Sequence, residues 1–248
     1  MPAALSSEFT RLSTHVWRLV EAQHRVSTMK LVDHVDEQAL LEDLLEETKP
    51  AYPPECEGLD YLLKTPFRYG AAYPHGSRFR RAGKTPGVFY AALEISTAIA
   101  EMAFYRLLFF AESPTTPLPS NPAEYTAFAV PIDSGKVLDL TAAPFDRDYA
   151  AWEDRLDYAA CQSFAETARN AEAEAIIYRS VRDPQRGCNI ALLTASAFSA
   201  PEPSERQTWR IRLSRAGVQA IRNHPLLRLG FSVIDFAEDP RIAAVIKS

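Results

Sequence analysis

Residues 88–110 read VFYAALEISTAIAEMAFYRLLFF, a short strand-like segment followed by a helix-like segment that is apolar on nearly every face. Ser96 or Thr97 offers an N-cap, and the apolar run predicts a helix from there to the end of the stretch. The only charges in this helix are Glu101 and Arg106, which lie too far apart around its axis to pair. Because a carboxylate on such a helix costs free energy unless something satisfies it, Glu101 is either a structural salt-bridge partner or a group that faces a ligand.

The segment before this helix concentrates positive charge. Tyr61–Leu93 contains no Asp or Glu, and its six basic residues are Lys64, Arg68, Arg78, Arg80, Arg81 and Lys84. Aromatic residues interleave with them. A solvated basic loop is the plain interpretation. The functional one is a site for an anionic ligand with a ring, because arginine binds phosphate oxygens bidentately and aromatic side chains stack on planar rings. A nucleotide and a nucleic acid both match this description of an anionic ligand with a ring.

The composition narrows the class of protein. The chain has 248 residues, 47% of them hydrophobic. Its net charge of -5 argues against a dedicated nucleic-acid binder. Its three cysteines form no CxxC pair, and its five histidines show no metal-ligand spacing, so we expect no metal and no bound cofactor. Phosphate-loop, dinucleotide-binding and nucleophile-elbow motifs are missing. No segment resembles a secretory signal or a membrane helix, and we expect a cytoplasmic protein.

Strand and helix patterns do not alternate regularly, which favours a single α+β domain over residues 1–248 with mixed or antiparallel sheets. The predicted strands are 16–20, 88–92, 125–132, 136–140, 175–181, 189–194, 208–213 and 231–236. The predicted helices are 36–49, 96–110, 149–158, 160–173 and 216–223, and 65–86 is expected to be mostly loop and short strand.

Four blocks, considered together, resemble the RES domain family. They are Gly76-Ser-Arg-Phe79, Gly87-Val-Phe-Tyr-Ala-Ala92, Ser96-Thr-Ala-Ile-Ala-Glu101, and Tyr178-Arg-Ser-Val-Arg-Asp183 with Asn189-Ile-Ala-Leu192. The positions that match the family's Arg, Glu and Ser are Arg78, Glu101 and Ser180, and Tyr90 matches its tyrosine. The resemblance implies a fold like that of ADP-ribosyltransferase toxins, in which two small sheets, flanked by helices, form a cleft for NAD. It covers about residues 16–240, with 30–60 as a helical insertion relative to compact members.

The resemblance also implies an activity, namely NAD degradation by hydrolysis or phosphorolysis of the nicotinamide–ribose bond. This reaction expels a neutral group from a cationic pyridinium, so it needs no general acid, and a carboxylate can stabilise the oxocarbenium-like transition state. The catalytic candidates are Glu101, Ser180, Tyr90 and Arg78. For NAD binding, Arg78 would anchor the pyrophosphate, Tyr90 would stack on nicotinamide, and Ser180 would position the ribose or Glu101. Arg68 is added because it lies in the same acid-free segment.

Two other functions stay open. The enzyme alternative is transfer of ADP-ribose to a protein or nucleic acid; Ile99, where such transferases often carry a second glutamate, leans toward NAD breakdown. The other is a non-catalytic nucleic-acid-binding module that uses Lys64–Lys84 and its aromatic residues, although nucleic acid is an improbable ligand for this acidic chain. As partners, the resemblance implies NAD and a cognate antitoxin protein, with no membrane; homo-oligomerisation is left open.

Overall fold

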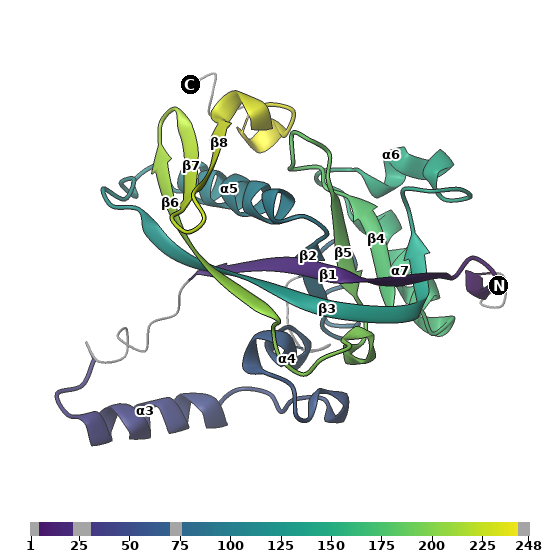
Figure 1. Cartoon of the computed structure of the whole chain (residues 1–248), viewed down its shortest axis with the longest axis horizontal. Coiled ribbons are helices and arrows are strands. Elements are labelled where there is room, and N and C mark those ends of the chain that lie inside the picture. Colours follow the sequence, from purple (N-terminus) through teal and green to yellow (C-terminus); the bar gives the residue numbers. More distant parts are fainter. Residues whose placement is uncertain (1–4, 22–30, 70–75, 243–248) are drawn as a thin grey trace.

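A computed structural model describes residues 5–21, 31–69 and 76–242. Its strands form one hydrogen-bonded sheet of eight strands in the order β1-β2-β5-β4-β3-β6-β7-β8, and β1 also pairs with β3. The first five strands of this order therefore close on themselves, and β6, β7 and β8 extend the sheet from β3 (Figure 1). The strand bounds are β1 Thr10–Glu21, β2 Phe89–Ala92, β3 Ala123–Asp139, β4 Ala175–Arg179, β5 Cys188–Leu192, β6 Glu205–Ser214, β7 Gly217–Arg222 and β8 Leu227–Ser232.

The expectation of two small sheets is corrected to one continuous mixed sheet. The strands predicted at 125–132 and 136–140 are a single strand, β3, which is 17 residues long. Its first part pairs with β6 and its last part with β4, while β1 runs antiparallel to it over almost its whole length. Because β3 pairs with β1 and β4 in the closed part of the sheet and with β6 in the extension, the two parts form one continuous sheet.

Five α-helices are described: α3 Val35–Glu47, α4 Tyr61–Arg68, α5 Ile95–Glu112, α6 Tyr149–Trp152 and α7 Ala159–Asn170. The predicted helices at 36–49, 96–110 and 160–173 correspond to α3, α5 and α7. The prediction of a helix at 216–223 was wrong, because this segment is β7, which pairs with β6 and β8. The expected loop at 65–86 overlaps the end of α4, and of the helix expected at 149–158 only the first turn forms.

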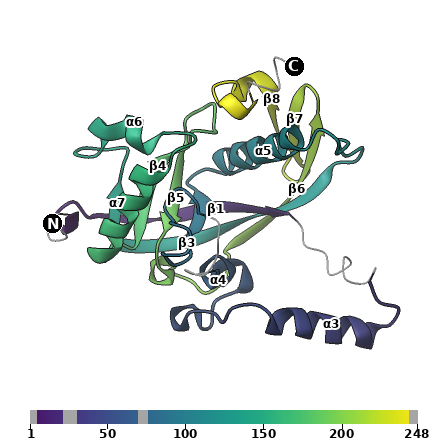
Figure 2. The same ribbon diagram turned by 180° about the vertical axis from the view of Figure 1, so that it is seen from behind.

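Helix α5 connects the two parts of the molecule that matter for the site. One side of it packs against β6–β8, where Ile99 and Phe104 meet Trp209 and Val218 in a buried cluster. Figure 2 shows α5 lying alongside these strands and α7 covering the other part of the sheet near β4. Burial of the apolar side of α5 leaves Glu101, near its N-terminal end, on the side that faces the ends of β4 and β5.

Candidate active site

A cavity of about 480 Å³ opens between the N-terminal half of α5 and the strands β1 and β2. Its walls are mostly apolar and aromatic with a few convergent polar groups, which is the usual character of a small-molecule site. The polar and charged groups in the lining are Arg18, Ser77, Arg78, Tyr90, Glu101, Tyr105, Tyr158, Tyr178, Arg182, Asn189 and Arg241. Three of the four family-matched residues, Arg78, Tyr90 and Glu101, therefore line one cavity.

The carboxylate of Glu101 is held by two buried donors. Its Oε1 atom accepts a hydrogen bond from Ser180 Oγ at 2.6 Å and another from Asn189 Nδ2 at 2.6 Å. Ser180 is 1% exposed and Asn189 is 4% exposed, so solvent does not compete for either bond. Oε2 has no hydrogen bond to any other described residue, which leaves this oxygen for a ligand in the cavity. The arrangement fixes the carboxylate before a ligand arrives.

Ser180 holds Glu101 through a hydrogen bond and does not itself line the cavity. Its Oγ atom accepts hydrogen bonds from the backbone N–H groups of Arg182 at 3.2 Å and Asp183 at 3.0 Å. Because both acceptor sites of the hydroxyl are then in use, its proton points to Glu101. Of the two roles predicted for Ser180, positioning of the ribose or of Glu101, this hydrogen bond supports the positioning of Glu101.

The loop that carries Ser180 is fastened to α5 by Asp183. Thr97 Oγ1 donates to Asp183 Oδ2 at 2.7 Å, and the N–H of Gly187 donates to the same oxygen at 3.2 Å. A Cβ atom at position 187 would lie 2.0 Å from Thr97 Oγ1, so only glycine fits beside this contact. Thr97 is thus not the N-cap that the sequence suggested; Glu94 occupies that position and makes no side-chain cap.

Tyr90 lines the cavity with its ring and anchors a loop with its hydroxyl. The hydroxyl oxygen accepts from the N–H of Phe79 at 2.9 Å and lies 2.8 Å from Ser77 Oγ. Burial raises the pKa of Tyr90 to about 12, so the phenol stays protonated near neutral pH. Tyr90 thereby ties β2 to the segment that contains Arg78.

Arg78 is 8% exposed and lies in the cavity wall. Its Nη1 atom donates to Trp152 O at 2.6 Å, and its Nη2 atom donates to Asp154 O at 2.9 Å. The guanidinium lies 4.6 Å from the ring centroid of Tyr158, and no carboxylate of the described residues pairs with it. The backbone bonds orient the group but leave its positive charge uncompensated, which favours an anion in the cavity.

Arg18 on β1 is a site residue that the sequence reading did not select. It is half-buried, donates from Nη1 to Tyr90 O at 2.8 Å, and lies 5.0 Å from the ring centroid of Phe89. Burial lowers the pKa of Arg18 to about 10, which still leaves it charged near neutral pH. Like Arg78, it forms no ion pair with a described carboxylate. The cavity wall therefore carries two arginines that can meet the two phosphates of a pyrophosphate.

Comparison with known proteins agrees with this geometry. A model of the RES domain matches residues 52–214, a range that contains Arg78, Tyr90, Glu101, Ser180 and Asn189. The chain belongs to the RES domain family. The match begins after α3, so this helix lies outside the matched part of the RES domain.

The fold of this RES protein is similar to one that is known from crystallography. The crystal structure of the MbcT–MbcA toxin–antitoxin complex of M. tuberculosis contains a chain that aligns with a TM-score of 0.50 at 14% sequence identity, over 85% of the present chain and 91% of the other. At this identity the likeness concerns the fold alone. No curated protein shows a significant sequence match.

Arg68, expected to bind NAD, lies elsewhere in this RES protein. On α4, its Nη1 atom pairs with Glu46 Oε1 at 2.6 Å, and its guanidinium lies 4.3 Å from the ring centroid of Tyr52. Its neighbours in the acid-free segment are also neutralised from a distance, because Glu166 pairs with Arg81 at 2.6 Å and with Lys84 at 2.9 Å. From the sequence these cations were expected to lack counter-charges, because no acidic residue lies near them along the chain. The fold brings carboxylates to them from distant positions in the chain.

Asn189 is the other functional residue that the sequence reading missed as a site residue. It lies at the start of β5, in a block that was predicted as a strand and used for the family resemblance but that was given no site residue. Within residues 5–21, 31–69 and 76–242 no His, Cys, Asp or Glu side chains gather in a cluster that would hold a metal ion. None of the described helices is long and apolar enough to cross a bilayer.

Proposed function

We propose that this RES-domain protein breaks the N-glycosidic bond between nicotinamide and ribose in NAD. The observation that carries the proposal is the Glu101 carboxylate, which Ser180 and Asn189 hold at the wall of a cavity that also presents Arg18 and Arg78. A fixed carboxylate stabilises a cationic sugar, and two uncompensated guanidiniums suit a pyrophosphate. Membership of the RES domain family and the toxin–antitoxin complex named for its structural neighbour support the same class of activity.

In the proposed reaction the bond between C1′ of the ribose and the pyridinium nitrogen breaks, and its electron pair stays on nicotinamide, which leaves neutral. The ribose carbon then carries positive charge in an oxocarbenium-like transition state, which Glu101 Oε2 faces. Water or phosphate supplies the oxygen that forms the new bond to C1′, and the incoming group releases a proton if it carries one. Tyr90 offers its ring to the nicotinamide, and Arg78 and Arg18 hold the phosphates.

The direct test is to incubate the purified protein with NAD and to measure free nicotinamide by chromatography, with and without added phosphate. Release in buffer alone indicates hydrolysis, and a rate that rises with phosphate together with a phosphorylated product indicates phosphorolysis. Nicotinamide release only when a protein or nucleic acid is added would move the assignment to ADP-ribosyl transfer. No nicotinamide under any of these conditions would exclude the proposal.

Arg78→Lys is expected to lower NAD affinity almost as much as Arg78→Ala. A lysine ammonium cannot reproduce the planar fork that spans Trp152 O and Asp154 O, so the charge would no longer be oriented toward the cavity. The measurement is calorimetric titration with NAD, and losing a charge-assisted contact corresponds to a drop of roughly tenfold or more. Arg147→Lys, on a side chain 76% exposed, serves as the control and should bind NAD normally. Wild-type affinity in Arg78→Ala would place the phosphate anchor elsewhere, with Arg18 as the next choice.

The alternative functions receive less support from the structure. Ile99 is fully buried in the cluster between α5 and β6–β8, so position 99 offers no group to a macromolecular acceptor. The basic segment proposed for nucleic acid is largely engaged within the protein, through Glu46 and Glu166. Both observations favour a small-molecule reaction at the cavity.

A cognate antitoxin is part of the proposal. A protein that destroys NAD needs a partner that blocks its cavity, and the structural neighbour is one component of a toxin–antitoxin complex. An acidic segment would complement the arginines of the cavity wall. Such a partner is expected to suppress nicotinamide release in the assay above, and a partner that binds without suppressing it would contradict this part of the proposal.

A further inference from the structure

Helix α3 is an acidic, amphipathic helix that none of the described protein covers. Its residues Val35–Glu47 include six acidic side chains and no lysine or arginine. None of its thirteen residues, all of them described, is buried, and Leu40, Leu44 and Leu45 are 60%, 51% and 45% exposed. A helix this short is marginal by itself in water, and its apolar side chains gain free energy when another surface covers them.

A second surface of the same chain has the opposite charge. The segment from Arg206 to Ser232 contains six arginines and no Asp or Glu. We define the arginine face as the exposed side chains of Arg210 and Arg212 on β6, Arg215 in the turn between β6 and β7, and Arg228 on β8. None of these four side chains forms an ion pair or hydrogen bond with another described residue. With four arginines and Glu124 opposite Arg210, the face keeps a net positive charge on a protein whose net charge is -5.

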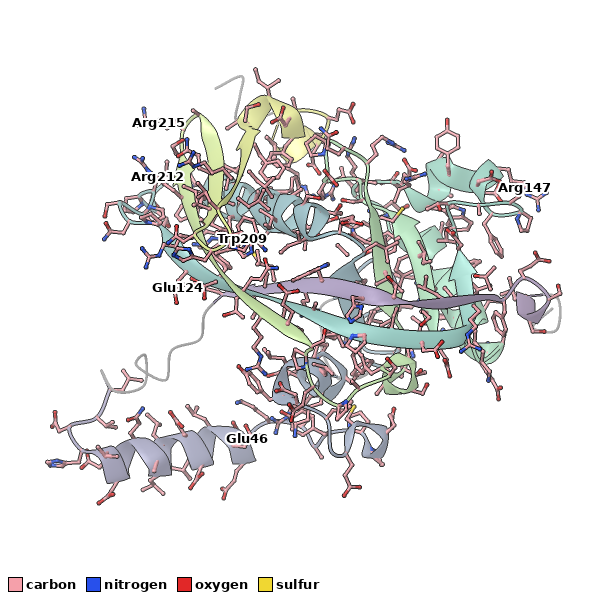
Figure 3. The ribbon with its side chains drawn as sticks, in the orientation of Figure 1. Glu46, Glu124, Arg147, Trp209, Arg212 and Arg215 are labelled. Carbon is pink, nitrogen blue, oxygen red and sulfur yellow. The ribbon has the colours of Figure 1, made fainter. Side chains whose placement is uncertain are left out.

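The strand register brings these side chains to one side of the sheet. Arg210 lies opposite Glu124 of β3 on one side and Ile221 of β7 on the other, and Ile221 lies opposite Arg228 of β8, so one row across four strands reads Glu-Arg-Ile-Arg. Arg212 is two residues further along β6, on the same side, opposite Gln219. Figure 3 shows Arg212 and Arg215 pointing outward, away from α5. The face is thus a flat surface of guanidinium groups with aliphatic stems and Ile221 between them.

The α3 helix does not cover the arginine face of its own chain. Figures 1 and 2 both place α3 at the opposite edge of the molecule from β7 and β8. Its described tie to the body is at its C-terminal end, where Glu46 pairs with Arg68 of α4. A surface that fits the arginine face is therefore present in the chain but displaced from it.

We infer that α3 of one copy docks on the arginine face of a second copy, so that two copies form a symmetric dimer with both contacts made twice. The acidic side chains of α3 meet Arg210, Arg212 and Arg228, and the leucines of α3 pack on the arginine stems and on Ile221. Each copy contributes one helix and one face, and because the two copies exchange these contacts reciprocally, the assembly is a closed twofold dimer and not an open chain.

A second copy fits better than a nucleic acid on the arginine face. A nucleic acid would neutralise the arginines but would leave the leucines of α3 exposed and would meet a protein of negative net charge. In the dimer, the contact between α3 and the arginine face covers the exposed leucines and also neutralises the arginines. Nucleic-acid binding is therefore kept as an outcome of the test.

The test uses two charge-reversed forms of the full chain, with mass measured by light scattering after size exclusion. One form carries Asp43→Lys and Glu47→Lys on α3, where lysine also suits the C-terminal end of a helix. The other carries Arg212→Glu and Arg228→Glu, neither of which lies opposite an acidic residue in the sheet. Each form alone brings like charges together at both contacts, so its dimer dissociation constant is expected to rise at least about a hundredfold. The wild type should be a dimer that weakens as salt is added.

The decisive measurement is the mass of the assembly after the two charge-reversed forms are mixed. In the mixed pair the lysines of one α3 meet the glutamates of the other face, and the unchanged α3 meets the unchanged face, so both contacts are attractive again. Recovery of the dimer on mixing also shows that both forms are folded. Arg147→Glu, on the far side of the molecule in Figure 3, is the control and should remain dimeric. A monomeric wild type, unaltered dimers in the reversed forms, no recovery on mixing, or a monomer that instead binds duplex DNA in a salt-sensitive way would each overturn the inference.

Discussion

Glu101→Gln is expected to lower the rate of nicotinamide release at least roughly 10²-fold, the usual effect of losing one preorganised electrostatic contact. Glutamine keeps the volume of the side chain, and its carbonyl oxygen can still accept from Ser180 and Asn189. Only the negative charge that would face the ribose in the proposed complex is lost. Because that charge acts on the cation that develops in the transition state, NAD affinity and melting temperature should barely change.

The matched control for this substitution is Glu94→Gln, an exposed glutamate that precedes the same helix and is absent from the cavity lining. It removes an equal charge near the same end of α5 and should leave the rate unchanged. A Glu101→Gln protein that melts many degrees lower would indicate a structural role for the carboxylate. One that still cleaves NAD at nearly the wild-type rate would remove Glu101 from the mechanism.

Asp239→Ala is expected to produce the largest loss of stability, about 3–5 kcal/mol, because it leaves a buried guanidinium without its counter-charge. Asp239 Oδ2 lies 2.9 Å from Arg182 Nη1, and both side chains are 2% exposed. The same carboxylate accepts three hydrogen bonds from Arg241, one from its backbone N–H and two from its guanidinium, at 3.0 Å each. For a domain of this size the loss corresponds to a melting temperature lower by about 10 °C, measurable by circular dichroism. Since Arg182 and Arg241 line the cavity, NAD affinity should also change.

The control is Asp148→Ala, which removes a carboxylate from an exposed pair with Arg147 at 3.9 Å and should cost at most about 1 kcal/mol. The contribution of Asp239 also depends on pH. Burial alone would raise the pKa of Asp239, but the hydrogen bonds from Arg241 and the charge of Arg182 bring it below its usual range. Its contribution is therefore present above the pKa of the unfolded chain and is lost as pH falls through the lower, folded value. Equal stability of Asp239→Ala and the wild type would contradict this account.

Local patterns in the sequence predicted those parts of the fold and site that depend on neighbouring residues. The apolar run after Ser96 was sufficient to predict α5, because a helix is set by contacts three and four residues apart. The patterns predicted β4, β5 and β6 within a few residues of their observed ends, and they predicted the second half of β1, which begins six residues earlier than expected. The order of short blocks around Arg78, Tyr90, Glu101 and Ser180 was sufficient to predict the RES domain family. From the same blocks Ser180 was predicted to position either the ribose or Glu101, and the hydrogen bond from Ser180 Oγ to Glu101 Oε1 agrees with the second of these alternatives.

Tertiary structure alone decided which charged and polar groups meet. Glu101 and Asn189 are 88 residues apart, and nothing in the local sequence of either shows that they share a hydrogen bond. Arg68 looked free because its segment has no acid, yet Glu46, 22 residues away, pairs with it. Arg18 enters the cavity because β1 runs beside β2 and β3, a pairing set by long-range ladders. The sequence by itself thus determined the family, the central helix and the position of Glu101 as the candidate carboxylate. The completed site and the single continuous sheet depend on strand pairing, which links residues too distant for local periodicity to relate.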